Sequence, residues 1–157
     1  MTIRVATAAD AEGLWQAHVA SIRGLCAGWY PDAEIAAWTG LLAAENYRIG
    51  VQDHVMLVAE GPDGAVVGFG ELDLERAEVR AVYVLPAVAQ TGTGSVLLAR
   101  LEQIARDHGL VRLTLCASLN AEAFYRRRGW SPGAREKHRL TAALAVDCVR
   151  MDKALSA

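Results

Sequence analysis

The sequence predicts a single α+β domain in which helices cover both faces of a mixed β-sheet. Segments with strand patterns alternate with segments of helical periodicity, which is typical of such a layered architecture. The chain has 157 residues, 53% of them hydrophobic, and this is sufficient for one substantial core. Because no repeat, linker or low-complexity segment interrupts the pattern, we expect one domain over residues 1–157.

The first quarter of the chain predicts a short strand and two helices. Residues 3–6 form the strand candidate, and Thr7 with Asp10 fits the S/T-x-x-D/E pattern of a helix start. Apolar residues then recur at helical spacing, and His18 lies on their face, where we expect a packed imidazole with a satisfied ring. Two glycines interrupt the pattern before Pro31, which is suited to begin the second helix.

Three aromatic residues gather at the break between these helices: Trp29, Tyr30 and Trp38. One interpretation is that they pack the helices onto the sheet. The other is that they line a ligand pocket, since loops on a rigid scaffold often carry function. The sequence leaves both open.

The remaining strands follow from apolar runs and turn residues. Residues 61–64, Gly-Pro-Asp-Gly, predict a turn that joins two strands into a hairpin. Asn120 is a candidate cap for a short helix over 121–128, and the arginine run 126–128 reads as a solvated face. The predicted strands are 55–60, 65–72, 78–85, 111–117, 135–140 and 146–153.

The most informative stretch is a strand, a glycine-containing loop and a helix between residues 82 and 108. Gly92 and Gly94 let the backbone take unusual dihedrals and let a ligand approach, and a helix starting near Val96 offers its N–H groups and dipole. This combination favours a phosphate or pyrophosphate site, although an ordinary strand–helix turn also fits. The loop lacks the Gly-Lys-Ser/Thr end of a P-loop, and Leu97 stands where a dinucleotide fingerprint has its third glycine.

Two motifs resemble those of the GCN5-related N-acetyltransferase (GNAT) family. Residues 83–98 resemble its acetyl-CoA-binding motif Q/R-x-x-G-x-G/A, although Ala89 stands at the Q/R position. Residues 120–130 resemble its second motif, N-x-x-A-x-x-F/Y-Y-x-x-x-G-F, at the usual separation. The resemblance implies a mostly antiparallel twisted sheet of six to seven strands, with a bulge that splays the central strands apart.

The resemblance also implies roles for particular residues. Tyr125 matches the tyrosine that protonates the leaving thiolate, and Glu71 is the candidate base, with Asp73 or a chain of water molecules as alternatives. Both carboxylates could equally be solvated hairpin residues. Expected cofactor contacts are Val82, Tyr83, Val84, Ala89, Gln90, Thr91, Gly92, Thr93, Gly94, Ser95, Asn120, Phe124 and Tyr125. Expected acceptor contacts are Trp29, Tyr30, Glu71 and Asp73.

The function that these observations favour is transfer of an acetyl group from acetyl-CoA to a primary amine by direct attack. The alternative is a non-catalytic acyl-CoA-binding sensor or partner-binding module of the same fold. A net charge of −2 argues against a general nucleic-acid or membrane-surface binder. The acceptor is open between a small-molecule and a protein amine, as is homodimer formation.

The cysteines and the N-terminus bear on the compartment. Cys26, Cys116 and Cys148 are few and widely spaced, so we expect reduced core thiols of a cytoplasmic protein and no zinc site. The first residues show no apolar region of a signal peptide, and no apolar run approaches a membrane span.

Overall fold

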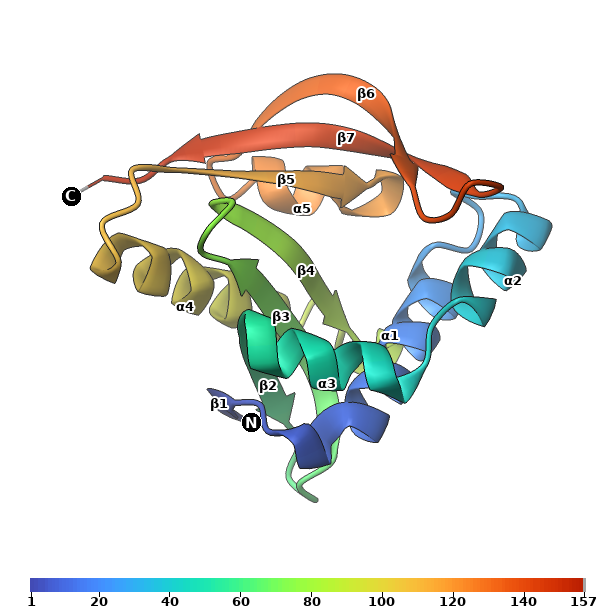
Figure 1. Cartoon of the computed structure of the whole chain (residues 1–157), viewed down its shortest axis with the longest axis horizontal. Coiled ribbons are helices and arrows are strands. Elements are labelled where there is room, and N and C mark those ends of the chain that lie inside the picture. The colour runs from blue at the N-terminus through green and yellow to red at the C-terminus, as the bar shows by residue number, and fades with distance from the viewer. Residues whose placement is uncertain (157) are drawn as a thin grey trace.

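The computed structural model describes residues 1–156, and within them seven strands form one open sheet in the order β1-β2-β3-β4-β5-β7-β6 (Figure 1). Neighbouring strands run antiparallel except β4 and β5, which are parallel. The strands are β1 Thr2–Val5, β2 Val55–Glu60, β3 Val66–Asp73, β4 Glu78–Val84, β5 Arg112–Ser118, β6 Ser131–Arg139 and β7 Ala145–Ala154. The helices are α1 Ala11–Leu25, α2 Asp32–Gly40, α3 Ala44–Asp53, α4 Thr93–Asp107 and α5 Glu122–Arg126. The expected α+β fold is confirmed.

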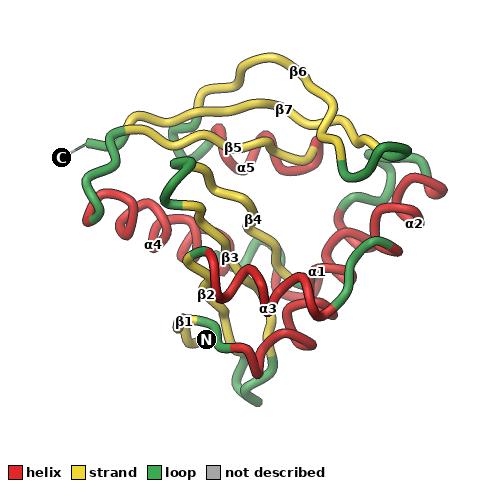
Figure 2. Tube along the Cα trace, viewed as in Figure 1, coloured by secondary structure: helices red, strands yellow, loops and turns green. Residues whose placement is uncertain are grey.

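Helices cover both faces of the sheet, as Figure 2 shows. Alternate residues of a strand point to opposite faces, and β2 illustrates this clearly. Leu57 and Ala59 belong to the core cluster under α4, whereas Met56 and Val58 belong to the cluster under α1 and α3. None of the helices within residues 1–156 is long and apolar enough to cross a membrane.

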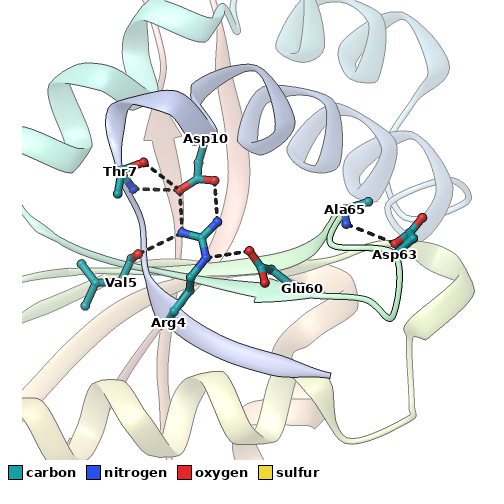
Figure 3. Close-up of polar contacts among 7 residues, drawn as sticks. All are labelled: Arg4, Val5, Thr7, Asp10, Glu60, Asp63 and Ala65. Atoms are coloured by element: carbon teal, nitrogen blue, oxygen red, sulfur yellow. Dashed lines mark hydrogen bonds and ion pairs between the residues drawn. The ribbon is translucent and has the colours of Figure 1, made fainter.

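An ionic network ties the N-terminal strand to the start of α1 (Figure 3). The Arg4 guanidinium lies 2.6 Å from the Glu60 carboxylate on β2 and 2.8 Å from both oxygens of Asp10. Asp10 also accepts a hydrogen bond from the Thr7 backbone N–H at 2.8 Å. These hydrogen bonds, above all those from Arg4, hold the pKa of Asp10 below its usual range. The predicted capping box is present, although a 3₁₀ turn at Ala8–Asp10 precedes α1.

The central strands β4 and β5 separate soon after they meet. Among the described residues they share one registered pair, Glu78 opposite Thr114, and then diverge (Figure 1). On its other edge β4 carries a bulge. Glu71 of β3 lies opposite Ala81 and Leu72 opposite Val79, so Arg80 is the extra residue. The expected splay is therefore observed, with its bulge two residues before Val82.

Several local predictions were wrong. Helix α3 was not predicted, because its sequence is mostly polar and it buries little beyond Tyr47 and Gly50. Helix α4 begins at Thr93, three residues before the expected Val96. Asn120 does not cap α5. It lies in a 3₁₀ turn, and its side chain accepts a hydrogen bond from the Cys26 thiol at 3.3 Å.

The prediction of three reduced thiols was also wrong. Cys116 on β5 and Cys148 on β7 form a disulfide, with Cα atoms 5.6 Å apart. The two strands are adjacent in the sheet but the cysteines are separated by 32 residues in the chain, so spacing alone did not reveal the pairing. Cys26 remains a free, buried thiol.

Candidate active site

The segment between β4 and α4 leaves backbone N–H groups outside the helical hydrogen-bond ladder. Gln90 and Gly92 have φ angles of 65° and 95°, so the chain turns through left-handed conformations just before the helix. The first intrahelical bond runs from the Val96 N–H to the Gly92 carbonyl at 3.0 Å. The N–H groups of residues 93–95 therefore precede the helical ladder, and together with the helix dipole they suit an anion.

The two glycines of this loop serve different purposes. Gly92 needs its positive φ, and there is open space where a Cβ would lie. Gly94 lies within the first turn of α4, where an added Cβ would approach the Phe124 ring to 3.2 Å. Gly94 therefore permits close packing between α4 and α5, which differs from the expectation that it admits a ligand.

Some backbone N–H groups of β4 point into the gap between the diverging strands β4 and β5. The Leu85 N–H bonds to the Val67 carbonyl on the β3 side. Because successive N–H groups of a strand point to opposite edges, those of Val82 and Val84 face β5. There the ladder has already ended, since the one β4–β5 pair is at Glu78. The predicted cradle of backbone donors around residues 82–84 is thus available at the gap.

The segment of the second motif packs against the first turn of α4. Arg128 donates to the Ser95 hydroxyl at 2.6 Å and to the Phe124 carbonyl at 2.7 Å, and its guanidinium lies 3.8 Å from the centre of the Phe124 ring. The arginine run is therefore not uniformly solvated, because Arg128 is a half-buried packing residue. Tyr125 is buried between Phe124 and Trp130, and its hydroxyl forms no hydrogen bond with any residue of 1–156.

Burial raises the pKa of Tyr125 above its usual value. The phenol therefore remains protonated at neutral pH and can donate its proton. Since its hydroxyl has no partner among the described residues, it is free to donate to a bound ligand.

A cavity of about 230 Å³ lies on the other side of β4, under α1, α2 and α3. One wall is aromatic. The Phe69 and Tyr83 rings stack at 5.9 Å, and His18 lies 4.1 Å from Tyr83. His18 Nδ1 shares a hydrogen bond of 2.7 Å with the Tyr47 hydroxyl, but Nε2 has no partner within residues 1–156. The prediction of a satisfied imidazole ring is therefore correct for Nδ1 and wrong for Nε2. Burial lowers the pKa of His18 to about 3, so the imidazole is neutral at pH 7.

The floor of the cavity is charged. Glu71 lines it with a side chain only 16% exposed, and Glu71 Oε2 lies 2.6 Å from His54 Nδ1 and 3.6 Å from Arg80 Nε. His54 Nε2 in turn lies 3.4 Å from Asp73 Oδ2. A backbone N–H from Arg76 is the main reason that the pKa of Asp73 is below its usual value. Asp73 belongs to a separate hollow beside His54 and does not line the cavity.

The two aromatic candidates for acceptor binding lie differently. Tyr30 lines the cavity and is 5% exposed, and its hydroxyl is used structurally. It donates to the Asp147 carbonyl at 2.6 Å and accepts from the Leu119 N–H at 2.9 Å. Trp29 is 57% exposed and lies outside the cavity lining. Tyr30 and Glu71 thus line the same cavity, whereas Trp29 and Asp73 lie outside its lining.

The sequence did not reveal four cavity residues, Tyr47, Arg80, His138 and Arg150, nor His54, which lies outside the cavity lining and contacts Glu71. Tyr47 and His54 belong to or follow the unpredicted α3. Arg80 faces the cavity because of a β-bulge, and no local sequence pattern predicts that bulge. For His18, which also lines the cavity, the sequence did place the side chain on the apolar face of α1.

Comparison with solved structures finds the same architecture over nearly the whole chain. A GCN5-related N-acetyltransferase from Rhodopseudomonas palustris, described as "Aminotransferase, Class-II", is 26% identical with a TM-score of 0.89, over 98% of this chain and 95% of that one. The PaiA N-acetyltransferase from Thermoplasma acidophilum in complex with coenzyme A is 21% identical with a TM-score of 0.78, over 98% and 99%. YncA from Salmonella typhimurium with acetyl-CoA is 24% identical with a TM-score of 0.71, over 100% and 95%.

Comparison with curated protein sequences gives no match. The family model described as an acetyltransferase (GNAT) domain matches residues 26–151, which include the cofactor loop, the β4–β5 gap and both motifs. The chain therefore belongs to the GNAT acetyltransferase family.

Proposed function

We propose that this protein is an N-acetyltransferase that moves an acetyl group from acetyl-CoA to a primary amine by direct attack in a ternary complex. The observation that carries the proposal is that the anion-binding loop and the acceptor cavity meet at β4. Val82 and Val84 turn their N–H groups to the gap, while Ala81 and Tyr83 line the cavity. Coenzyme A and acetyl-CoA in two structural neighbours support the choice of cofactor.

The cofactor side fits the chemistry of acetyl-CoA. The N–H groups of residues 93–95 and the positive-φ loop before them would hold the pyrophosphate. Acetyl-CoA, when bound, supplies an acetyl group activated as a thioester. The backbone donors of Val82 and Val84 would stabilise negative charge that develops on the carbonyl oxygen, and such donors are each typically worth about 10²–10³ in rate.

Glu71 is the proposed base that removes the proton from the acceptor amine. Its contacts with His54 and Arg80 both involve Oε2, which fixes the carboxylate. Within residues 1–156 Oε1 accepts no hydrogen bond, so it is available to an amine in the cavity. Tyr125 is the proposed acid, because its hydroxyl is protonated and has no partner among the described residues.

Direct attack is favoured over a cysteine acyl-enzyme. Cys116 and Cys148 are joined in a disulfide. Burial raises the pKa of the Cys26 thiol to about 11, so little thiolate is present at neutral pH. Cys26 also donates to Asn120, which is a structural contact.

The test is release of free CoA from acetyl-CoA in the presence of a broad panel of primary amines. We expect amine-dependent release, and we expect Glu71→Gln to reduce it most at low pH, where the amine is largely protonated. Glu75→Gln is the matched control, because Glu75 lies in the hollow outside the cavity. Binding of acetyl-CoA without release for any amine would favour the non-catalytic sensor.

A further inference from the structure

We propose that the acceptor is a small α-amino acid with an apolar side chain, whose carboxylate binds Arg80 while its amine contacts Glu71. This inference rests on the proposed function and names the substrate class of the same cavity. It is carried by an arginine of the cavity lining, with a side chain 44% exposed, whose guanidinium donates no hydrogen bond to another residue of 1–156.

Arg80 lies at the β4 bulge and lines the cavity beside Glu71. Its closest ionic contacts are 3.6 Å to Glu71 and 4.0 Å to Glu78, both longer than a hydrogen bond. Within residues 1–156 its guanidinium donates no hydrogen bond. A guanidinium offers five N–H donors in a planar fork that matches a carboxylate, so Arg80 can bind one in a bidentate manner.

The spacing of the two charges matches an α-amino acid. Standard bond lengths place the amine nitrogen and the carboxylate carbon of such a molecule about 2.5 Å apart. Glu71 Oε2 and Arg80 Nε are 3.6 Å apart, so adjacent amine and carboxylate groups meet an adjacent carboxylate and guanidinium. His54 holds Glu71 at 2.6 Å, which keeps this pair of charges in place.

The rest of the cavity favours an apolar side chain on a small molecule. Beyond the aromatic wall of Phe69 and Tyr83, the lining includes Trp38, Leu140 and Val146. A cavity of about 230 Å³ is smaller than the roughly 300–1,000 Å³ typical of sites for drug-sized ligands. It therefore suits an acceptor of amino-acid size.

A polycationic acceptor fits the charges poorly. Arg80 and Arg150 both line the cavity and would repel a second ammonium group. Glu78 is 3.5 Å from Arg150, and Asp147 is already paired with Lys137 at 2.6 Å and Arg135 at 3.0 Å. Few carboxylates remain for further positive charges.

The test compares acceptors that differ only in the carboxylate. We would measure kcat/KM by CoA release for L-phenylalanine against 2-phenylethylamine, and for L-leucine against 3-methylbutylamine, with spermidine as the polycation. We expect at least one amino acid to exceed its decarboxylated partner by tenfold or more. Arg80→Gln should lower kcat/KM for that amino acid about 10–100-fold, the effect of one charge-assisted contact, and leave the simple amine within about twofold.

Controls separate this contact from other effects. Arg76→Gln removes a charge from a side chain 78% exposed outside the cavity, and it should leave both substrates unchanged. Arg80→Lys keeps the charge without the fork and should lie between wild type and Arg80→Gln. If the Arg80 variants do not fold, the comparison of amino acids with their decarboxylated partners on the wild-type protein still tests whether the cavity selects a carboxylate.

The opposite results would overturn the inference. One is a kcat/KM for the simple amines or spermidine that equals or exceeds that for the amino acids. The other is an equal loss of kcat/KM for the amino acid and the simple amine in Arg80→Gln. Calorimetric titration of the CoA-saturated protein with the same molecules distinguishes failure of the proposed function. Selective binding of the amino acid without transfer would support the acceptor site and reject catalysis, whereas unselective or absent binding would reject the acceptor site.

Discussion

The hydroxyl of Tyr30 holds together segments that are distant in sequence, and Tyr30→Phe should measure its contribution. The residue lies between α1 and α2, and its hydroxyl contacts Asp147 at the start of β7 and Leu119 after β5. The phenyl ring of the variant would keep the packing against Trp38, whose ring centre is 5.5 Å away. The substitution thus removes two hydrogen bonds with little change in volume.

The magnitude follows from the groups left behind. An orphaned buried donor costs about 1–3 kcal/mol, and the Asp147 carbonyl also loses a partner, so we expect a loss of about 2 kcal/mol in unfolding free energy. For a domain of this size, 1 kcal/mol corresponds to about 2–4 °C in Tm, so the midpoint should fall by about 4–8 °C. Thermal and urea unfolding followed by circular dichroism would measure it.

The control is Trp29→Phe, because Trp29 is exposed and lies next to Tyr30 in the chain. Surface substitutions of this kind usually change stability by less than about 0.5 kcal/mol. A Tyr30→Phe protein that unfolds within 1 °C of wild type would refute the view that this hydroxyl is structural. The predicted acceptor role of Tyr30 would then be better explained by the hydroxyl itself contacting the ligand.

Three further predictions concern the cofactor loop, the acid and a buried histidine. Gly92→Ala forces an L-residue to φ 95°, at a cost of about 1–2 kcal/mol, and should weaken acetyl-CoA binding in calorimetry. Gly64→Ala, at φ 81° in the hairpin turn, should cost similar stability without loss of affinity. Tyr125→Phe should lower kcat by about 10²–10⁴ with cofactor affinity near wild type, and an unchanged kcat on a chemistry-limited substrate would exclude Tyr125 as the acid. The pKa of His18 is about 3 when folded and 6.5 in the reference state, so its stabilising contribution is present above pH 6.5 and lost as pH falls toward 3. Urea midpoints should fall less steeply over that range in His18→Gln, and parallel profiles would contradict the assignment.

The proposed cofactor site could be inferred from the sequence because its determinants are local. A strand, two glycines and an amphipathic helix follow one another within residues 82–108. Their order alone implies that the N-terminus of the helix lies beside the end of the strand. The packing contact of Gly94, in contrast, has no local signal in the sequence. Its neighbour is Phe124, thirty residues later, and only the packing of α5 on α4 reveals that contact.

Of the cavity that we propose as the acceptor site, the sequence indicated Tyr30 and Glu71 but few other residues, because the lining comes from strands and helices far apart in the chain. Arg80 faces the cavity only because the β3–β4 register shifts by one residue, which reverses the alternation of side chains along the strand. His54 contacts Glu71 and Asp73, yet nothing in the sequence around it indicates these partners. The disulfide was missed for the same reason, since β5 and β7 are neighbours only in the folded sheet.

Charges that pair across strands lie beside the last point at which β4 and β5 meet. That point is Glu78 of β4 opposite Thr114 of β5, and within residues 1–156 no other registered pair joins the two strands. An alternating series of charges runs through it: Glu71 on β3, Arg80 and Glu78 on β4, then Arg150 on β7 and Glu136 on β6. At its centre the contacts are loose, at 3.5–4.0 Å, whereas the last, between Arg150 and Glu136, is tight at 2.8 Å. Loose pairing at the centre leaves guanidinium donors for a ligand, while tight pairing at the outer strand keeps the wall in place. The loosely paired guanidinium groups are therefore the groups that we propose an acceptor contacts.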